Sequence, residues 1–263
     1  MTLDTIDTLF FDLDGTLTDN YAGIAGCIVH ALARLDRAAP ATAELQACIG
    51  PPLRHNFARL LDTHDTAMIE RALALYRERF DVDGWRENVP YPGIHDALRT
   101  LADRGFRMFV CTSKPHRYAT RIVEHFELMP FFEEVYGPDL AGKLDDKRDL
   151  LQHAVAQHAS GGRAIDPARS LMIGDRAQDI RAGLANSFRT LGVLYGYGSA
   201  DELNDAGATA LCPSVDALVE AIDSLAAGTP MHVRVNGDVL ADPSGGVVDS
   251  INPPGGRKID VSS

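Results

Sequence analysis

The 263-residue sequence has few cysteines, no long apolar run and a deficit of positive charge. Its four cysteines, Cys27, Cys48, Cys111 and Cys212, have no paired spacing, which argues against a disulfide framework and against a zinc site. No apolar run approaches the length of a membrane span, and no signal-peptide pattern opens the chain. We therefore expect a cytoplasmic protein without a membrane partner.

The charge balance excludes a further class of protein. With 25 Lys and Arg against 37 Asp and Glu, the formal net charge is −12, which argues against a generic nucleic-acid-binding surface. A small basic pocket can still bind phosphate locally. The nine histidines show no metal-ligand spacing, and no Gly-x-Ser-x-Gly or Walker pattern occurs. The length is enough for one large or two modest domains.

One stretch near the start of the chain concentrates charge at the end of an apolar run. Leu9, Phe10 and Phe11 are typical of a buried parallel strand, and Asp12 and Asp14 follow at its carboxyl end. In open α/β sheets ligands bind at that end. A purely structural role is hard to reconcile with Asp12, because a helix cap would lie outside the apolar run. Two neighbouring buried carboxylates need a shared cation.

The region that follows is predicted to be all-helical. Asp19 is expected to cap a helix over residues 21–35, and a second helical pattern covers residues 66–80. Between them lies the turn-rich segment Gly50-Pro51-Pro52-Leu53-Arg54. No convincing strand occurs before Pro90. Residues 20–89 therefore form a predicted helical insert.

Strands and helices alternate after Pro90. The predicted strands cover residues 107–111, 170–173, 189–193 and 209–211 and the neighbourhood of Val135, and the predicted helices cover 94–104, 117–126, 146–158 and 178–186. This alternation predicts an α/β fold, a Rossmann-like doubly wound parallel sheet, with residues 1–19 and 90–227 as its core.

The last segment, residues 228–263, is rich in Gly and Pro and has no helical period. Residues 233–240 carry an Asn-Gly pair between apolar residues, which predicts a β-hairpin with a type I′ turn. We expect residues from Ser244 onward to be disordered.

Four segments at or near predicted strand ends can be considered together: Asp12-Leu13-Asp14-Gly15-Thr16, Thr112-Ser113-Lys114, a lysine at Lys143 or Lys147, and Gly174-Asp175-Arg176-Ala177-Gln178-Asp179. In this order they resemble the four motifs of the haloacid dehalogenase superfamily of phosphohydrolases, over about residues 9–225. The helical insert is similar to that family's small cap domain. The resemblance is to the phosphoglycolate phosphatase-like branch, which implies a phosphatase acting on a small phosphorylated metabolite.

The resemblance implies a role for each acid of these motifs. Asp12 would attack phosphorus and form an aspartyl phosphate, and Asp14 would protonate the leaving oxygen and later activate water. Mg²⁺, which prefers oxygen ligands, would be held by the Asp12 carboxylate, the Asp14 main-chain carbonyl and Asp175. Asp179 would act mainly on a metal-bound water.

The second and third motifs would bind the phosphate. Thr112 and the Ser113 amide would hold its oxygens, although a serine or threonine here could merely cap the next helix. Lys114 is expected at the surface. Lys147 is favoured over Lys143 as the third-motif lysine, because it begins a predicted helix and would be more firmly positioned.

Substrate specificity is expected to reside in the insert. Arg54, on a loop stiffened by Pro51 and Pro52, is predicted to bind an anionic part of the substrate; the alternative is an exposed arginine at the start of a helix, without a partner. A 5′-nucleotidase-like specificity, a β-phosphoglucomutase-like phosphotransferase and a non-catalytic phosphate-binding protein are the alternative functions. Asp14 argues against a dehalogenase, which has no alkoxide to protonate. The chain could form a homodimer.

Overall fold

A computed structural model describes residues 5–159, 163–227, 234–235 and 238–239. Its centre is a six-stranded sheet in which every neighbouring pair of strands is parallel. In spatial order the strands are β5 (Glu134–Tyr136), β4 (Arg107–Cys111), β1 (Thr8–Phe11), β6 (Ser170–Gly174), β7 (Arg189–Val193) and β8 (Ala210–Cys212). The predicted doubly wound parallel sheet is confirmed.

Both faces of the sheet are covered, which explains why its central strands are largely apolar. Phe10 stacks on Phe109 at 4.9 Å between ring centroids and packs in a core cluster with side chains of helix α7 (Lys147–Gln157), which lies against helix α8 (Ala177–Ala185). Leu9 and Phe11 belong to the other cluster. That cluster includes side chains from α5 (Ile94–Asp103), α6 (His116–His125) and α10 (Leu218–Ala226).

The order of the strands locates the functional end of the sheet. From β1 the chain moves outward through β4 and β5, then returns to the other side of β1 and continues through β6, β7 and β8. The strand order therefore reverses between β1 and β6, and ligands bind at the carboxyl ends of strands flanking such a point. Asp12 follows β1, Thr112 follows β4 and Asp175 follows β6.

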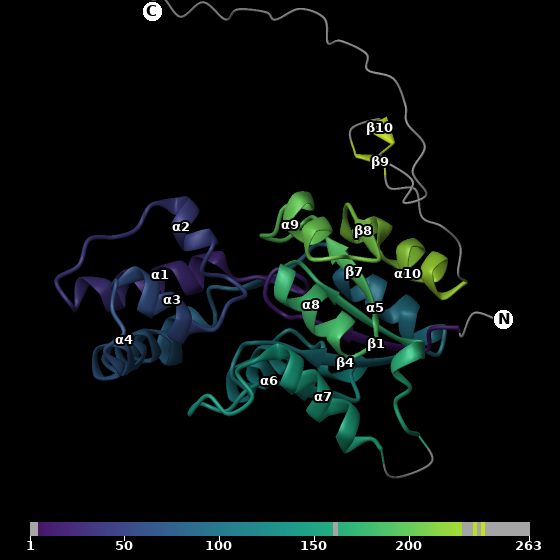
Figure 1. Cartoon of the computed structure of the whole chain (residues 1–263), viewed down its shortest axis with the longest axis horizontal. Coiled ribbons are helices and arrows are strands. Elements are labelled where there is room, and N and C mark those ends of the chain that lie inside the picture. Colours follow the sequence, from purple (N-terminus) through teal and green to yellow (C-terminus); the bar gives the residue numbers. More distant parts are fainter. Residues whose placement is uncertain (1–4, 160–162, 228–233, 236–237, 240–263) are drawn as a thin grey trace, which may run out of the picture. The chain divides into compact units, whose positions relative to one another are not determined.

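The helical insert comprises α1 (Tyr21–Ala33), α2 (Thr42–Gln46), α3 (Leu53–Leu60) and α4 (Thr66–Arg79), followed by a π-helical turn over Phe80–Gly84. Figure 1 shows this group of helices beyond one end of the sheet. The two helices with a clear apolar period, α1 and α4, are the ones that the sequence predicts. The domain boundaries at residues 19/20 and 89/90 stay a prediction.

The prediction that residues 20–89 contain no strand is wrong at the end of this range. Strand β2 (Thr18–Asp19) pairs antiparallel with β3 (Val89–Pro90), so that the two chain segments leading into and out of the insert are hydrogen-bonded together. Strands of two residues are too short to show any periodicity, and a proline normally argues against a strand.

The remaining elements are short. Helices α9 (Ala200–Asp205) and α10 were not predicted, and single 3₁₀ turns occur at Met129–Phe131, Pro167–Arg169 and Val215–Ala217. In the C-terminal segment β9 (Arg234–Val235) pairs antiparallel with β10 (Asp238–Val239), as the predicted hairpin requires. The Asn-Gly turn and the residues from Ser244 onward lie outside the described residues. Among the described helices, none combines the length and apolar character of a membrane span.

We predict that a chain ending at Gly228 keeps its thermal stability. All six strands of the sheet and their helices precede this point, and a two-stranded hairpin contributes little stability. The midpoint of thermal unfolding, followed by circular dichroism, should change by less than about 2 °C. A fall of more than about 5 °C would show that the C-terminal segment stabilises the fold.

Candidate active site

The carboxyl end of β1 places a buried aspartate beside a buried lysine. Asp12 is 1% exposed, and the Nζ atom of Lys147 lies 3.0 Å from its Oδ1 atom. Lys147 is the first residue of α7, whose N-cap is the carboxylate of Asp146. The rival candidate, Lys143, is exposed, and its main-chain N–H donates to Asp139. The structure therefore brings Lys147, and not Lys143, to Asp12.

Three acids of the predicted site lie together. One oxygen each of Asp12, Asp175 and Asp179 can be chosen so that all lie within 4.8 Å of one another, and all three residues are buried. Lys147 also forms an ion pair with Asp179. Burial and the charge of Asp12 raise the pKa of Asp179 to about 6, although Lys147 opposes this shift. Burial and the charges of Asp179 and Asp12 raise the pKa of Asp175 well above its usual range.

The donor set suits Mg²⁺. Three carboxylates face a single ammonium group, so the cluster carries excess negative charge in a buried place, and its ligand atoms are oxygens. Hard divalent cations bind such groups, and a cation would relieve the repulsion. Asp12 and Asp175 would be its carboxylate ligands, and Asp14 would contribute its main-chain carbonyl as the motif implies.

A loop after β7 holds Asp175 in place. The main-chain N–H of Tyr197 donates to Asp175 Oδ2 at 2.8 Å, and the Thr16 hydroxyl donates to Oδ1 at 3.4 Å. At Gly196 a Cβ atom would lie 2.3 Å from the Gly15 carbonyl oxygen and 2.4 Å from Asp175 Cβ, so only glycine fits there. The sequence interpretation missed this loop, whose signal is the repeated glycine in Tyr195-Gly196-Tyr197-Gly198.

Asp14 is paired with a lysine that was expected at the surface. Lys114 is 8% exposed, its Nζ atom lies 2.7 Å from Asp14 Oδ2, and it lies 5.0 Å from the centroid of the Phe80 ring. The surface prediction is wrong because Phe80, from the insert, covers this side chain. Burial raises the pKa of Asp14, although Lys114 opposes the shift. A protonated Asp14 is the form that can donate a proton.

The second motif lies beside these acids. Thr112 directly follows β4 and is 1% exposed, and its hydroxyl accepts a hydrogen bond from the Lys114 main-chain N–H at 3.2 Å. Ser113 lines the neighbouring pocket. The Thr112 hydroxyl therefore bonds within its own turn and does not cap α6, which begins at His116. Phosphate binding by Thr112 and Ser113 stays a prediction.

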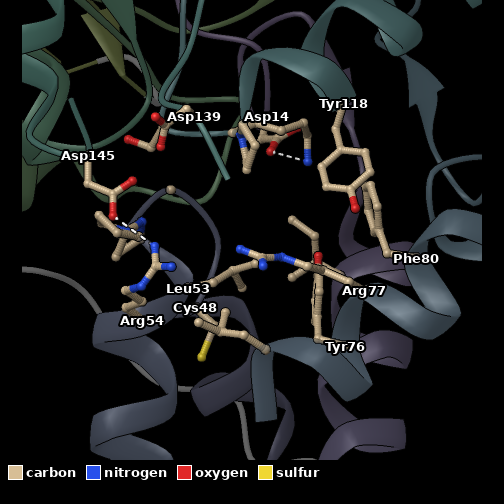
Figure 2. Close-up of a pocket in the computed structure, with 18 residues that line it drawn as sticks. Asp14, Cys48, Leu53, Arg54, Tyr76, Arg77, Phe80, Tyr118, Asp139 and Asp145 are labelled. Atoms are coloured by element: carbon tan, nitrogen blue, oxygen red, sulfur yellow. Dashed lines mark hydrogen bonds and ion pairs between the residues drawn. The ribbon is translucent and has the colours of Figure 1, made fainter. Parts of the chain in front are cut away.

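A pocket lies between the insert and this end of the sheet (Figure 2). It encloses about 690 Å³, part of it open to solvent. Its charged lining residues are Asp14, Lys114, Arg54, Arg77, Asp139 and Asp145, and its aromatic ones are Tyr76, Phe80 and Tyr118.

Arg54 lies in this pocket, as its predicted role requires. It is the second residue of α3, and its guanidinium lies 2.8 Å from Glu70 and 3.3 Å from Asp145. The alternative of an arginine without a partner is wrong. Its role in specificity stays a prediction.

Comparison with known proteins agrees with this geometry. A model of the family described as haloacid dehalogenase-like hydrolase matches residues 9–193. A 5′-nucleotidase of Pseudomonas aeruginosa is 39% identical over 82% of this chain and 95% of its own. The tyrosine-protein kinase PtkA of Mycobacterium tuberculosis is 35% identical over 81% and 72%, and a phosphoglycolate phosphatase of Pseudomonas putida is 31% identical over 72% and 70%.

A solved structure shares the whole fold. The crystal structure of a predicted phosphatase from Clostridium acetobutylicum superposes with a TM-score of 0.79 at 36% identity. The match covers 84% of this chain and 99% of that one, so it includes both the sheet and the helical insert.

We predict that the two lysines differ sharply in their effect on stability. Lys147→Ala leaves three buried carboxylates without their ammonium partner and should lower the free energy of unfolding by about 3–5 kcal/mol in metal-free buffer at pH 7. Lys143→Ala changes an exposed residue and should change it by less than about 0.5 kcal/mol. Urea unfolding measures both, and equal losses would contradict the assignment of Lys147 to this cluster.

Proposed function

Because the chain belongs to the haloacid dehalogenase-like hydrolase family, we propose that it is a Mg²⁺-dependent phosphatase that hydrolyses a small phosphate monoester. The observation that carries this proposal is the buried Asp12 at the carboxyl end of β1, between Lys147 and Asp175. Such a position supplies a fixed carboxylate nucleophile with compensating positive charge.

In the first step an Asp12 carboxylate oxygen attacks phosphorus, and the bond from phosphorus to the leaving oxygen breaks. Asp14, two residues further along the chain, donates its proton to that oxygen, so that the oxygen leaves as a hydroxyl group and not as an alkoxide. The raised pKa of Asp14 favours the protonated form that this step needs. The Lys114 ammonium group, 2.7 Å from Asp14 Oδ2, fixes the direction of the carboxyl group.

In the second step Asp14, now a carboxylate, takes a proton from water, and the resulting oxygen attacks the phosphorus of the aspartyl phosphate. The bond between phosphorus and Asp12 breaks, which releases inorganic phosphate and restores both aspartates. Lys147, Thr112 and the Ser113 amide hold the phosphate oxygens during both steps. Bound Mg²⁺ would neutralise charge between the phosphate and the carboxylates.

The proposal extends to the class of substrate. We favour a phosphoglycolate phosphatase-like specificity, in which residues 20–89 act as a cap that closes the pocket over the leaving group. A 5′-nucleotidase-like specificity is the second candidate, because the Pseudomonas aeruginosa relative carries that name and its similarity spans the insert as well. A panel of phosphometabolites that includes 2-phosphoglycolate and AMP distinguishes the two.

The role of Asp12 as nucleophile can be tested by comparing two aspartate variants, one at each end of β1. Asp12→Asn replaces the carboxylate by a weak amide nucleophile, and kcat with p-nitrophenyl phosphate should fall by at least about a thousandfold. Asp7→Asn is the matched control, because Asp7 precedes β1 at its other end and pairs with Arg169 at 2.7 Å. A kcat of the Asp12→Asn variant within threefold of the parent, which is about 0.65 kcal/mol in activation free energy, would rule out Asp12 as the nucleophile.

The cation has its own test. After dialysis against EDTA the protein should lose phosphatase activity, and Mg²⁺ should restore it, because the cluster of three carboxylates repels the phosphate without a cation. Asp175→Asn should raise the Mg²⁺ concentration needed for half-maximal activity. Full activity in EDTA would contradict the Mg²⁺ requirement and leave the family assignment untouched.

A further inference from the structure

The pocket contains two arginines from the insert, and they differ in what their guanidinium groups contact. Arg54 has carboxylate partners: Nε and NH2 donate to Glu70 at 2.8 and 3.5 Å, and NH1 donates to Asp145 at 3.3 Å. Its NH2 also donates to the Leu140 carbonyl at 3.3 Å. Because two acids neutralise Arg54, it lacks free charge with which to attract an anion.

The other charged side chains of the pocket have partners as well. Lys114 pairs with Asp14 at 2.7 Å. Asp139 accepts a hydrogen bond from the Lys143 main-chain N–H at 2.9 Å, and hydrogen bonds from this turn lower the pKa of Asp139. Its charge is therefore stabilised by its own turn.

Arg77 is the exception among the described residues that line the pocket. It is half-buried on α4, and NH2 donates to the Leu140 carbonyl at 2.9 Å. No carboxylate of the described residues lies within 4.0 Å of it. Figure 2 shows its guanidinium crossing the middle of the pocket, below Asp14 in this view, with Tyr76 beside it.

We propose that Arg77, and not Arg54, binds an anionic group carried by the leaving group of the substrate. The inference rests on the proposed phosphatase function, and it narrows the substrate to phosphate monoesters whose leaving group bears a carboxylate or a second phosphate. The apolar side chains of Ile24, Leu53 and Leu73 line the same pocket. An anion placed there needs a cationic partner, and a guanidinium binds carboxylate or phosphate through two parallel hydrogen bonds.

The position of Arg77 suits this role. Asp14, the proposed proton donor to the leaving oxygen, lines the same pocket, so the leaving group must extend from Asp14 toward the insert. The hydrogen bond to Leu140 fixes one end of the Arg77 guanidinium and leaves its other N–H groups for a ligand. A neutral leaving group would leave this charge without a partner, which is unfavourable in a closed pocket.

The test compares substrate preference across four arginine variants, at Arg77, Arg71 and Arg54. The measured quantity is kcat/KM for 2-phosphoglycolate, and for fructose 1,6-bisphosphate, each divided by kcat/KM for AMP, whose leaving group is neutral. In Arg77→Ala at least one of these ratios should fall by about ten- to a hundredfold, as expected for a lost charged hydrogen bond. The ratio that falls identifies the anion as a carboxylate or a phosphate. Arg77→Lys keeps the positive charge but not the two parallel N–H donors, so it should lower the ratio less than Arg77→Ala does.

Two control variants make the outcome decisive. Arg71 lies on the same helix, is exposed and is not among the pocket residues, so Arg71→Ala should leave the ratios within about twofold. If Arg54→Ala lowers the ratios and Arg77→Ala does not, the proposal is overturned in favour of Arg54. Equal effects of Arg77→Ala on all substrates would also overturn it.

A binding measurement separates this inference from the phosphatase proposal. Calorimetric titration with Mg²⁺ and 2-phosphoglycolate or fructose 1,6-bisphosphate can be made on Asp12→Asn and on Asp12→Asn/Arg77→Ala, neither of which should turn over. Weaker binding to the double variant, by about tenfold or more, supports the role of Arg77 even if the parent hydrolyses no substrate of the panel. Equal binding of both anions by the two variants contradicts that role, whatever the parent hydrolyses.

Discussion

The arrangement of this protein depends on one electrostatic constraint, the close approach of Asp12, Asp175 and Asp179 in a buried place. Like charges at this separation repel strongly when water is excluded. The fold meets the constraint from several directions: α7 begins with Lys147, and main-chain N–H groups at Arg176 and Tyr197 donate to Asp179 and Asp175. Positive charge and dipoles are thus supplied by segments far apart in the sequence.

Much of this frame could be predicted from the sequence, because the central strands β1 and β6 are buried at every residue and are therefore largely apolar. The acids stand out where such a run stops, as Asp12 does after Phe11 and Asp175 after Gly174. Lys147 could be chosen over Lys143 because an amphipathic pattern begins at the former. These signals are local, since each can be read within about ten residues of the chain.

Features that depend on distant partners could not be predicted in this way. Lys114 follows a strand just as a solvated residue would, but in the folded chain it contacts Asp14 and the Phe80 ring, which are far from it in sequence. The loop at Tyr197 supports Asp175, yet its sequence shows only a turn. Likewise, the two prolines before Arg54 indicate a stiff loop, but whether Arg54 or Arg77 is neutralised depends on Glu70 and Asp145. Ion pairs between side chains of different helices and loops leave no periodic pattern in the sequence, so they cannot be predicted from it.

The short ladder between β2 and β3 has a mechanical consequence. The two connections between the insert and the sheet are hydrogen-bonded to each other, with Thr18 opposite Pro90 and Asp19 opposite Val89. They therefore form one hydrogen-bonded unit, so that any movement of the insert relative to the sheet has to displace both connections together. Tyr197 donates to Asp19 at 2.6 Å while its main chain donates to Asp175, so this unit and a proposed metal ligand share one anchoring residue. The place where the insert joins the sheet is thereby tied to the residue that positions Asp175.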